Sequence, residues 1–267
     1  MRIFANLFPE GKKAALTMSY DDGRDFDKRL VEIFNKNGIK GTFHLNSSRM
    51  TQPGNGCVTL DEVKDVYKGH EVSCHTVTHP FPSITPETTL VNEILEDRRA
   101  LEKACGCTVR GMSYPYGNFS DRDIQIFSAC GMRYSRTTLA TGGFSVPENF
   151  MKWHPTCHHK GNLVGLFDNL MNQTKRYLRH DVMYVWGHSY EFNNDDNWQI
   201  IEEFCAYAGG HEEIWYATNI EIYDYIMASR GLMVGVDGRS VYNPSNITVW
   251  ATADGKPVAL KPGENLL

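Results

Sequence analysis

Short apolar runs alternate with amphipathic segments along most of the chain. Seven runs have the length and the β-branched or aromatic content of buried strands. They cover Ala14–Ser19, Gly41–Leu45, Glu71–Cys74, Arg110–Ser113, Met132–Arg136, Val182–Trp186 and Ile214–Ala217. Because strands that are covered on both faces are apolar throughout, this pattern predicts a parallel sheet between layers of helices.

Amphipathic segments lie between these runs. In residues Arg24–Asn37, apolar side chains recur at helical spacing, and Gly38 stands where a C-terminal cap belongs. A capping box at Thr59–Glu62 starts a further helix, and others are expected over Thr85–Ala104, from Ser120 to Gly131 and over Asn197–Ala208. Seven strand–helix units in series predict an α/β fold whose sheet is closed into a barrel or left open.

The pattern changes at Gly231. From there to Leu267, short β-branched runs are separated by turn pairs such as Asp237-Gly238 and Asp254-Gly255. We expect strands and hairpins that pack on the outside of the barrel, because the segment is too short for a good core of its own. The predicted organisation is a barrel over residues 1–230 and a short β-rich C-terminal extension over residues 231–267.

Composition narrows the possible partners. The 267 residues are enough for one large core, and a net charge of −5 without a Lys/Arg cluster gives no electrostatic case for nucleic acid. No signal-like start or bilayer-length apolar window is present, and an odd number of cysteines favours reduced thiols. The expectation is a cytoplasmic protein without membrane or nucleic-acid partners; the oligomeric state is not indicated.

Two adjacent carboxylates end the first predicted strand. Asp21 and Asp22 follow an apolar run and precede Gly23. Like charges so close resist ionising together, and a bound cation resolves the conflict. One carboxylate can then bind a metal while its neighbour acts as a base toward water. The alternative is a surface turn, since Asp-Asp-Gly is a favourable turn sequence.

A histidine pair follows the third predicted strand. His75 and His79 are four residues apart, a spacing that places both imidazoles on one face of a helical turn, although such pairs also occur by chance. Two imidazoles and one carboxylate suit Zn²⁺, while Co²⁺, Ni²⁺ or Fe²⁺ would accept the same ligands. Three protein ligands leave a position open for water, as a catalytic site requires.

Other chemically capable residues also follow predicted strands. Pro115-Tyr116-Gly117 comes after the fourth strand, Arg136 ends the fifth, and His188 follows the sixth. In a barrel of parallel strands these ends meet on one face, where such enzymes place their chemistry. The candidate residues are therefore expected to converge.

Four ordered motifs resemble those of the polysaccharide deacetylases with the NodB-homology fold, a carbohydrate esterase type. They are Thr17–Gly23, His75–His79, Tyr114–Gly117 and Val185–His188. The resemblance covers about the first 230 residues and implies a distorted (β/α)7 barrel that binds a divalent metal, usually zinc.

The resemblance also implies roles for individual residues. Asp22, His75 and His79 would bind the metal, and Asp21 would take a proton from metal-activated water. The backbone N–H of Tyr116 would stabilise the oxyanion, and His188 would protonate the departing amine.

Two features depart from the family pattern. Many members carry an arginine two residues before the motif proline, where this chain has Ser113; the nearest upstream arginine is Arg110. Many also carry an Asp and a Trp after the fifth strand, where this chain has Tyr134–Thr137. Arg136 is expected to supply the missing guanidinium, and Glu191 to orient His188. Further candidates for contacts with substrate or with the catalytic residues are Arg110, Pro115, Tyr114, Trp186 and His158.

The function predicted from the sequence is metal-dependent hydrolysis of N-acetyl groups on amino-sugar-containing oligo- or polysaccharides. Such an enzyme acts on linear amide C–N bonds, with a carbohydrate or small amide as substrate. One alternative is hydrolysis of a non-sugar or cyclic amide on the same barrel. Another is a catalytically weak carbohydrate-binding barrel, which would have no need for a base, an acid and an open metal site together.

Overall fold

The centre of the molecule is a parallel sheet built around the strand β2. The computed structural model describes residues 2–173 and 179–267. Its main sheet has the strand order β6-β5-β4-β3-β2-β8-β7, and β9 pairs with the first half of β2. The strands are β2 (Ala14–Asp21), β3 (Gly41–Leu45), β4 (Glu71–Cys74), β5 (Gly111–Ser113), β6 (Tyr134–Arg136), β7 (Cys157–His158), β8 (Asp181–Gly187) and β9 (Ile214–Tyr216).

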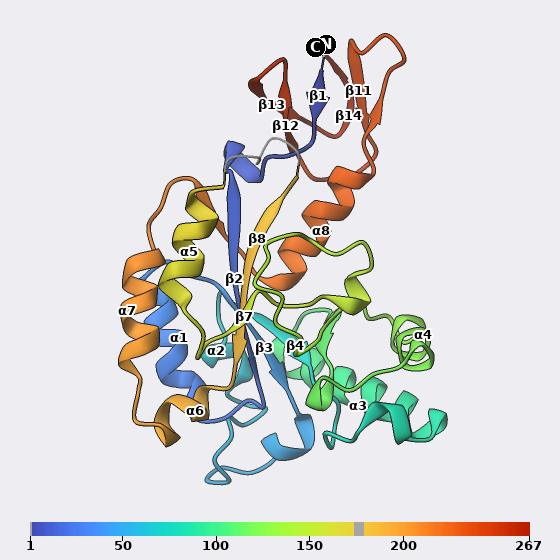
Figure 1. Ribbon diagram of the computed structural model, residues 1–267. Coiled ribbons are helices and arrows are strands. Elements are labelled where there is room, and N and C mark those ends of the chain that lie inside the picture. The colour runs from blue at the N-terminus through green and yellow to red at the C-terminus, as the bar shows by residue number, and fades with distance from the viewer. Residues whose placement is uncertain (1, 174–178) are drawn as a thin grey trace.

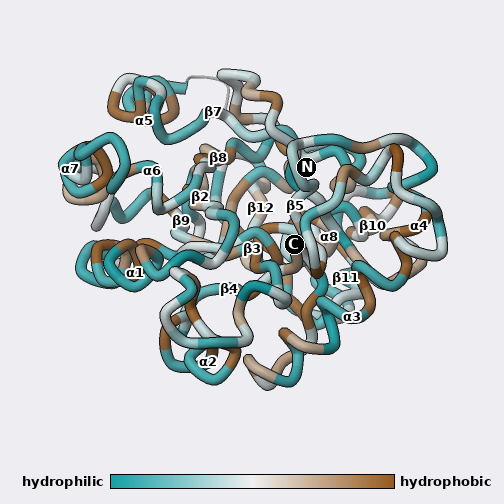
Figure 2. Tube along the Cα trace, turned by 90° about the horizontal axis from the view of Figure 1, so that it is seen from below, coloured by the Kyte–Doolittle hydropathy of each residue, from teal (hydrophilic) through white to brown (hydrophobic). Residues whose placement is uncertain are grey.

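Helices cover this sheet, with α1, α2, α3, α5 and α7 lying at the periphery of the strands (Figure 2). The helices are α1 (Asp27–Lys36), α2 (Val63–Val66), α3 (Glu87–Cys105), α4 (Asp121–Ala129), α5 (Leu163–Met171), α6 (Ser189–Asn194), α7 (Gln199–Ala208) and α8 (Asn219–Arg230). Within the described residues, 3₁₀ turns lie between some of the helices and strands, namely η1 (Pro9–Gly11), η2 (Ser47–Met50), η3 (Pro82–Ile84), η4 (Pro115–Gly117) and η5 (Phe150–Lys152). The predicted α/β class and the curled (β/α)7 arrangement are confirmed.

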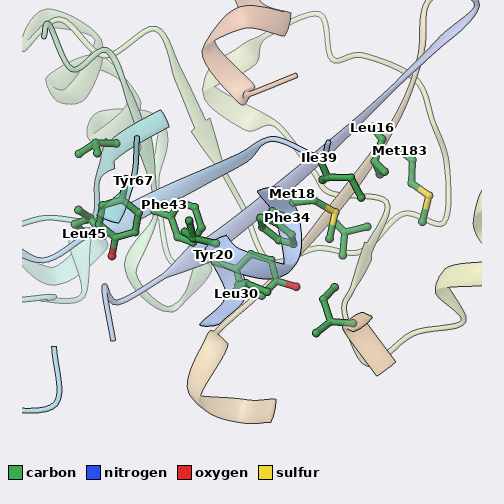
Figure 3. Close-up of a cluster of buried hydrophobic side chains, with 14 of the residues drawn as sticks. Leu16, Met18, Tyr20, Leu30, Phe34, Ile39, Phe43, Leu45, Tyr67 and Met183 are labelled. Carbon is green, nitrogen blue, oxygen red and sulfur yellow. The ribbon is translucent and has the colours of Figure 1, made fainter. Parts of the chain in front are cut away.

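Burial explains why β2 forms the centre. All eight of its residues are buried, and its apolar side chains pack against α1 and β3. Tyr20 lies near Phe34 of α1 and Phe43 of β3 in the core cluster (Figure 3). Full burial of one such side chain contributes about 1.5–3 kcal/mol, so this cluster fixes the strand whose end carries Asp21 and Asp22.

The C-terminal segment forms two small antiparallel sheets at one end of the molecule (Figure 1). Their strands are β1 (Ile3–Phe4), β10 (Met233–Val234), β11 (Ser240–Asn243), β12 (Val249–Ala253), β13 (Lys256–Leu260) and β14 (Gly263–Leu266). β1 pairs with β12, so the start of the chain contributes a strand to the sheet of the extension. The division of the chain at residue 230 stays a prediction.

Some elements escaped the sequence analysis. The strand β7 has only two residues and exists through its pairing with β8, so it leaves no periodic signal. The helices α5, α6 and α8 were not expected either. In α8 the apolar residues are distributed around the helix instead of forming one stripe, because buried residues occur on several sides.

The carboxyl ends of the central strands meet at one edge of the sheet. Asp21 is the last residue of β2, and Ser113 and Arg136 are the last residues of β5 and β6. His75 and His188 directly follow β4 and β8. The topology therefore brings the candidate residues to one place. In the part of the chain described, no helix has both the length and the apolar character needed to traverse a bilayer.

Candidate metal centre and surrounding cavity

Asp21 and Asp22 differ in backbone conformation, because β2 ends at Asp21 and the chain turns at Asp22. Asp21 continues the β2–β3 pairing opposite His44, whereas Asp22 has a φ of 79°, in the left-handed region. Asp tolerates this region better than most residues. The Asp22 N–H donates to the carbonyl oxygen of His44 at 2.9 Å, which fixes the turn. The two neighbouring carboxylates can therefore take different partners.

His75 and His79 meet Asp22 as predicted, but not on a helical turn. Thr76 and His79 have φ values of 67° and 61°, so the segment is a loop with two left-handed residues. The Nε2 atoms of His75 and His79 are 3.0 Å apart. The donor atoms of Asp22, His75 and His79 all lie within 4.8 Å of one another. One cation can reach all three.

Hydrogen bonds to residues distant in the sequence hold this loop in a non-helical conformation, despite the helical spacing of its two histidines. The Asn46 side-chain amide donates to the carbonyl oxygens of His75 and Thr76 at 2.6 and 2.9 Å. The carboxylate of Glu93 accepts from the Thr78 N–H at 2.8 Å. These contacts satisfy the backbone groups that a helix would otherwise pair internally, so the helical expectation was wrong.

Asp97 holds two loops of the site together and was not found from the sequence. It lies in α3, fully buried, and accepts from the backbone N–H of Ser47 at 2.9 Å and of His75 at 3.1 Å. Burial raises the pKa of Asp97 to about 7. A signal was present: Asp97 falls on the apolar face that Leu90, Ile94 and Leu101 define at helical spacing.

Ser113 sets the tautomer of His75. The Nδ1 atom of His75 lies 2.9 Å from the carbonyl oxygen of Ser113, which can only accept. Nδ1 therefore carries the proton, and Nε2 presents its lone pair to the centre. Burial lowers the pKa of His75, which favours this neutral form. Ser113 thus has a role although it replaces the arginine of the family pattern.

Arg136 pairs with Asp21. Its guanidinium contacts Asp21 Oδ2, and the Ser113 hydroxyl donates to Oδ1 at 3.1 Å. Burial alone would raise the pKa of Asp21, but Arg136 and His75 outweigh it and hold that pKa well below its usual range. The Arg136 guanidinium also lies 4.4 Å from the ring centre of Trp186. The structure places Arg136 where the missing guanidinium was expected.

Arg110 lies elsewhere, and its expected place in the site is corrected. It directly precedes β5, so it stands at the opposite end of the strand from Ser113. Its guanidinium forms two hydrogen bonds to the Asp224 carboxylate of α8, at 2.8 and 2.7 Å.

A cavity of about 490 Å³ opens over the three-residue centre. It is lined by Asp21, Asp22, Arg49, His75, His79, Tyr114, Tyr116, Thr138, Trp186, His188 and Tyr190. Arg49 escaped the sequence analysis, because it lies in the turn after β3; its Nη1 is 3.5 Å from Asp22 Oδ1. The cavity combines the metal-type ligands, an ionised carboxylate and an aromatic wall.

The Pro115–Gly117 turn forms one rim of the cavity. Pro115 is buried beneath it, and Tyr116 has a φ of 59°. The ring of Tyr116 stacks on Phe81 at 3.9 Å and is 56% exposed. The N–H groups of Gly117 and Asn118 close the turn, and among the described residues no partner is found for the Tyr116 N–H. That N–H can serve a ligand.

His188 forms the opposite wall. Its Nδ1 lies 3.4 Å from Glu191 Oε2. Burial alone would lower the pKa of His188, but Glu191 and the two aspartates reverse this effect and raise it. The expected contact of Glu191 with His188 is therefore present. Tyr114 lies deeper, with its hydroxyl donating to the Met151 carbonyl oxygen at 2.8 Å.

His158 is not among the residues that line the cavity. It belongs to β7 rather than to a loop, and its Nε2 lies 3.0 Å from Glu191 Oε2. Its place is thus behind His188, not against substrate, which corrects that expectation. His154, four residues before His158, has its Nδ1 2.6 Å from the Thr137 hydroxyl.

Comparison with known proteins identifies the first half of the chain. Residues 9–135 match the family model of polysaccharide deacetylase. The match includes the motifs around Asp21, His75 and Tyr116 but ends one residue before Arg136, so His188 and Glu191 lie outside it.

Two curated relatives are similar to this chain. Chitooligosaccharide deacetylase from Sinorhizobium fredii is 42% identical over 119 residues, which are 42% of this chain and 51% of that protein. Chitin deacetylase 1 from Cryptococcus neoformans var. grubii is 29% identical over 140 residues, which are 51% of this chain and 28% of that protein. The chain thus spans about half or less of the length of these relatives.

The fold has solved counterparts. The structure of a Mycobacterium smegmatis protein classed with the polysaccharide deacetylases aligns with a TM-score of 0.64 at 15% identity, covering 84% of this chain and 93% of that chain. At this identity the likeness concerns the fold alone. Residues 9–135 thus resemble the polysaccharide deacetylase family, and the chain shares its fold with this solved structure.

Proposed function

We propose that this chain is a metal-dependent deacetylase that hydrolyses N-acetyl groups of amino sugars in oligo- or polysaccharides. One observation carries the proposal: Asp22, His75 and His79 converge in the same cavity as Asp21, whose pKa is held low by Arg136. The match of residues 9–135 to the family model of polysaccharide deacetylase supports the same chemistry. A binding module has no use for this combination.

The residues fit a divalent cation. Two imidazole nitrogens and one carboxylate oxygen within 4.8 Å are the donor types that zinc prefers, so we propose Zn²⁺ as the ion. The tautomer of His75 leaves Nε2 free to coordinate. When bound, the ion would polarise the amide carbonyl and ease deprotonation of water. The open side of the centre faces the cavity.

The chain's own groups supply proton transfer. Asp21 is the general base: it accepts the proton that water loses as its oxygen bonds to the carbonyl carbon. Arg136 keeps Asp21 ionised and fixes Oδ2, while the Ser113 hydroxyl holds Oδ1. The Tyr116 N–H stabilises the negative charge that develops on the carbonyl oxygen.

His188 is the general acid. It gives a proton to the nitrogen as the C–N bond breaks, so the products are acetate and a free amine. Its raised pKa favours the protonated form, and with Glu191 beside Nδ1 the other ring nitrogen is the one proposed to face the cavity. Tyr116 and Phe81 form an aromatic platform at the rim on which a sugar ring can pack.

The test is acetate release from N-acetylglucosamine and its short oligomers, with purified protein loaded with zinc. We expect turnover by the wild type and a loss of at least 10³-fold in Asp21→Asn, which keeps the shape but removes the base. Retained metal content in Asp21→Asn is the control for an intact centre. Turnover of cyclic imides alone, or sugar binding without acetate release, would contradict the proposal.

A further inference from the structure

Two arginines lie at the cavity without a close carboxylate partner. Arg49 lines the cavity, and Arg24 lies over the ring of Tyr190, another lining residue, with 5.9 Å between the guanidinium carbon and the ring centre. Arg24 comes shortly after β2, and Arg49 belongs to the turn η2 after β3; these two strands are paired in the sheet (Figure 1). Both arginines therefore belong to loops at the end of the sheet that carries the metal centre.

Other arginines of the chain have their charge matched more closely. Ion pairs of 2.7–2.9 Å with a carboxylate are made by Arg29, Arg98, Arg110, Arg122 and Arg179. Within residues 2–173 and 179–267, Arg24 forms no ion pair. Its Nε is buried without a hydrogen-bond partner, and its Nη1 lies 3.9 Å from the Cys57 sulfur, a weak acceptor. A buried guanidinium N–H without a partner calls for an acceptor.

Arg49 makes one ion pair in the described chain, and it is long. Its Nη1 lies 3.5 Å from Asp22 Oδ1, the same oxygen that faces His79 Nε2 at 4.0 Å. Asp22 is a proposed ligand of the cation, and an ion bound there offsets the charge of this carboxylate. The side chain of Arg49 is 39% exposed. Its guanidinium is therefore available to a ligand in the cavity.

The charges at the cavity favour an anion. Among the residues that line it, the carboxylates are Asp21 and Asp22. Asp21 is paired with Arg136, and Asp22 serves the cation. A divalent ion together with Arg49 therefore leaves the lining with an excess of positive charge. Such a cavity attracts an anionic group and repels a cationic one.

We propose that the amino sugar bound in this cavity carries a carboxylate, which Arg49 recognises, with Arg24 as a second cation further from the centre. A guanidinium donates two parallel N–H groups, which match the two oxygens of a carboxylate. The carboxylate belongs either to the reacting sugar, as an ether-linked acid, or to the next sugar, as a uronic acid. The inference rests on the proposed deacetylase function, since it names acidic rather than neutral amino sugars as the substrate class of the same site.

The experiment compares two acids with their own methyl esters, which remove the charge and keep most of the shape. One acid is the 3-O-carboxymethyl ether of N-acetylglucosamine, and the other is the disaccharide of glucuronic acid and N-acetylglucosamine. Dissociation constants are measured by calorimetry in zinc-loaded Asp21→Asn, so that turnover does not interfere. We expect at least one acid to bind about tenfold or more tightly than its ester, and added salt to reduce this ratio. The acid that shows the larger ratio identifies the sugar that carries the carboxylate.

Arginine variants in the same background locate the preference. Arg49→Gln should reduce the acid-to-ester ratio to about twofold or less, and Arg49→Lys, which keeps the charge without the planar fork, should retain part of it. Arg24→Gln does not alter a contact of Asp22 and should lower the ratio about threefold, which keeps the inference testable if Arg49→Gln binds zinc poorly. Elemental analysis reports the zinc content. Arg29→Gln is the matched control: Arg29 is paired with Glu202 and does not line the cavity, so the ratio should persist.

Binding and turnover separate this inference from the proposed function. Equal binding of acid and ester for both ligands, or an undiminished ratio in Arg49→Gln and Arg24→Gln, would overturn the inference, whatever the rate of acetate release by the wild type. A tenfold preference that Arg49→Gln removes, without acetate release from any of the ligands, would instead contradict the deacetylase function. The cavity would then be a binding site for acidic amino sugars, with Arg49 still its recognition residue.

Discussion

Arg136 and Asp21 form a buried ion pair that joins the ends of β6 and β2. Both side chains are almost fully shielded from solvent, and Arg136 is held from its other face by Trp186. A surface pair of this kind contributes little, but one partner left alone in the interior is costly. The pair therefore determines both the stability of this edge of the sheet and the charge of the proposed base.

Arg136→Met is expected to lower kcat/KM for acetate release by about 10²-fold or more. Without the guanidinium, burial of Asp21 is no longer opposed, and the pKa of Asp21 rises. The base is then protonated at pH values where the wild type is ionised, so the acid limb of the pH–rate profile moves to higher pH. Breaking the pair should also reduce the free energy of unfolding by about 3–5 kcal/mol.

Two variants control for this result. Arg136→Lys keeps the charge and should restore part of the activity and most of the low-pH limb. Arg110→Met removes a half-exposed pair with Asp224 at the other end of the barrel, so it should change stability by at most about 1 kcal/mol and leave the pH profile in place. An unshifted acid limb in Arg136→Met would show that Arg136 does not control Asp21.

The loops that carry the proposed metal centre depend on Asp97. Its two oxygens accept the backbone N–H groups of Ser47 and His75, so Asp97→Ala leaves two buried donors without partners. Each such donor costs about 1–3 kcal/mol. We also expect metal affinity at this centre to fall about 10–100-fold, as for other residues that orient ligands. Chemical unfolding and zinc titration measure the two effects.

Glu96→Gln is the neighbouring control for Asp97. Glu96 is exposed on the same helix, and its one ion pair among the described residues is with exposed Arg99, so its loss should be close to neutral. Equal zinc affinity in Asp97→Ala and Glu96→Gln would show that Asp97 serves the helix and not the ligand loop.

Much of this fold could be predicted from the sequence, because it follows from hydrophobic patterns within short segments of the chain. The predicted bounds of β3 and β4 coincide with those observed, and both strands are short and buried throughout. β5 and β6 are separated from β2 by β3 and β4, but all these parallel strands end at the same edge of the sheet, and this places Arg136 within reach of Asp21. The carboxyl ends of parallel strands lie at one edge of the sheet, whatever conformation the connecting loops adopt.

The remaining features arise from contacts between distant segments. The conformation of His75–His79 depends on hydrogen bonds to Asn46, Glu93 and Asp97, which lie 15 to 29 positions from their partners, so spacing alone gave the wrong backbone. The meeting of His158 with Glu191 depends on a two-residue strand that forms only against β8. The residues of a short segment do not indicate which distant segment it will pair with.

A buried carboxyl far from the centre gives stability its pH dependence. Glu71 begins β4 and accepts hydrogen bonds from Thr42, Tyr134 and the Ile220 N–H. Burial raises the pKa of Glu71 from 4.5 to about 7. Between these values the folded chain keeps a proton that the unfolded chain has released, so the stability contributed by that proton is lost as pH rises from about 5 to about 7. The loss is roughly 3 kcal/mol.

Glu71→Gln should remove this pH dependence. The amide oxygen can accept from Thr42 and Ile220, and the amide NH₂ can donate to the Tyr134 hydroxyl, which has Ser73 as its other partner. We expect the variant to gain stability over the wild type at pH 8 and to match it near pH 4, measured by urea unfolding at both pH values. Glu202→Gln, on the surface, should show no such crossover.

Tyr116 is proposed to act through two different groups, its backbone N–H and its aromatic ring. Its N–H is proposed to stabilise the developing oxyanion, whereas its exposed ring stacks on Phe81 at the rim. Tyr116→Asn removes the ring but retains the N–H, and Asn accepts a φ of 59° well. The variant should therefore raise KM for chito-oligosaccharides about tenfold, as for loss of a stacking contact, while kcat changes little. Phe81→Ala is the companion variant, because it removes the support of the ring without touching the turn. If Tyr116→Asn lowered kcat and left KM unchanged, the ring would act in the chemical step and the platform would not be a sugar-binding surface.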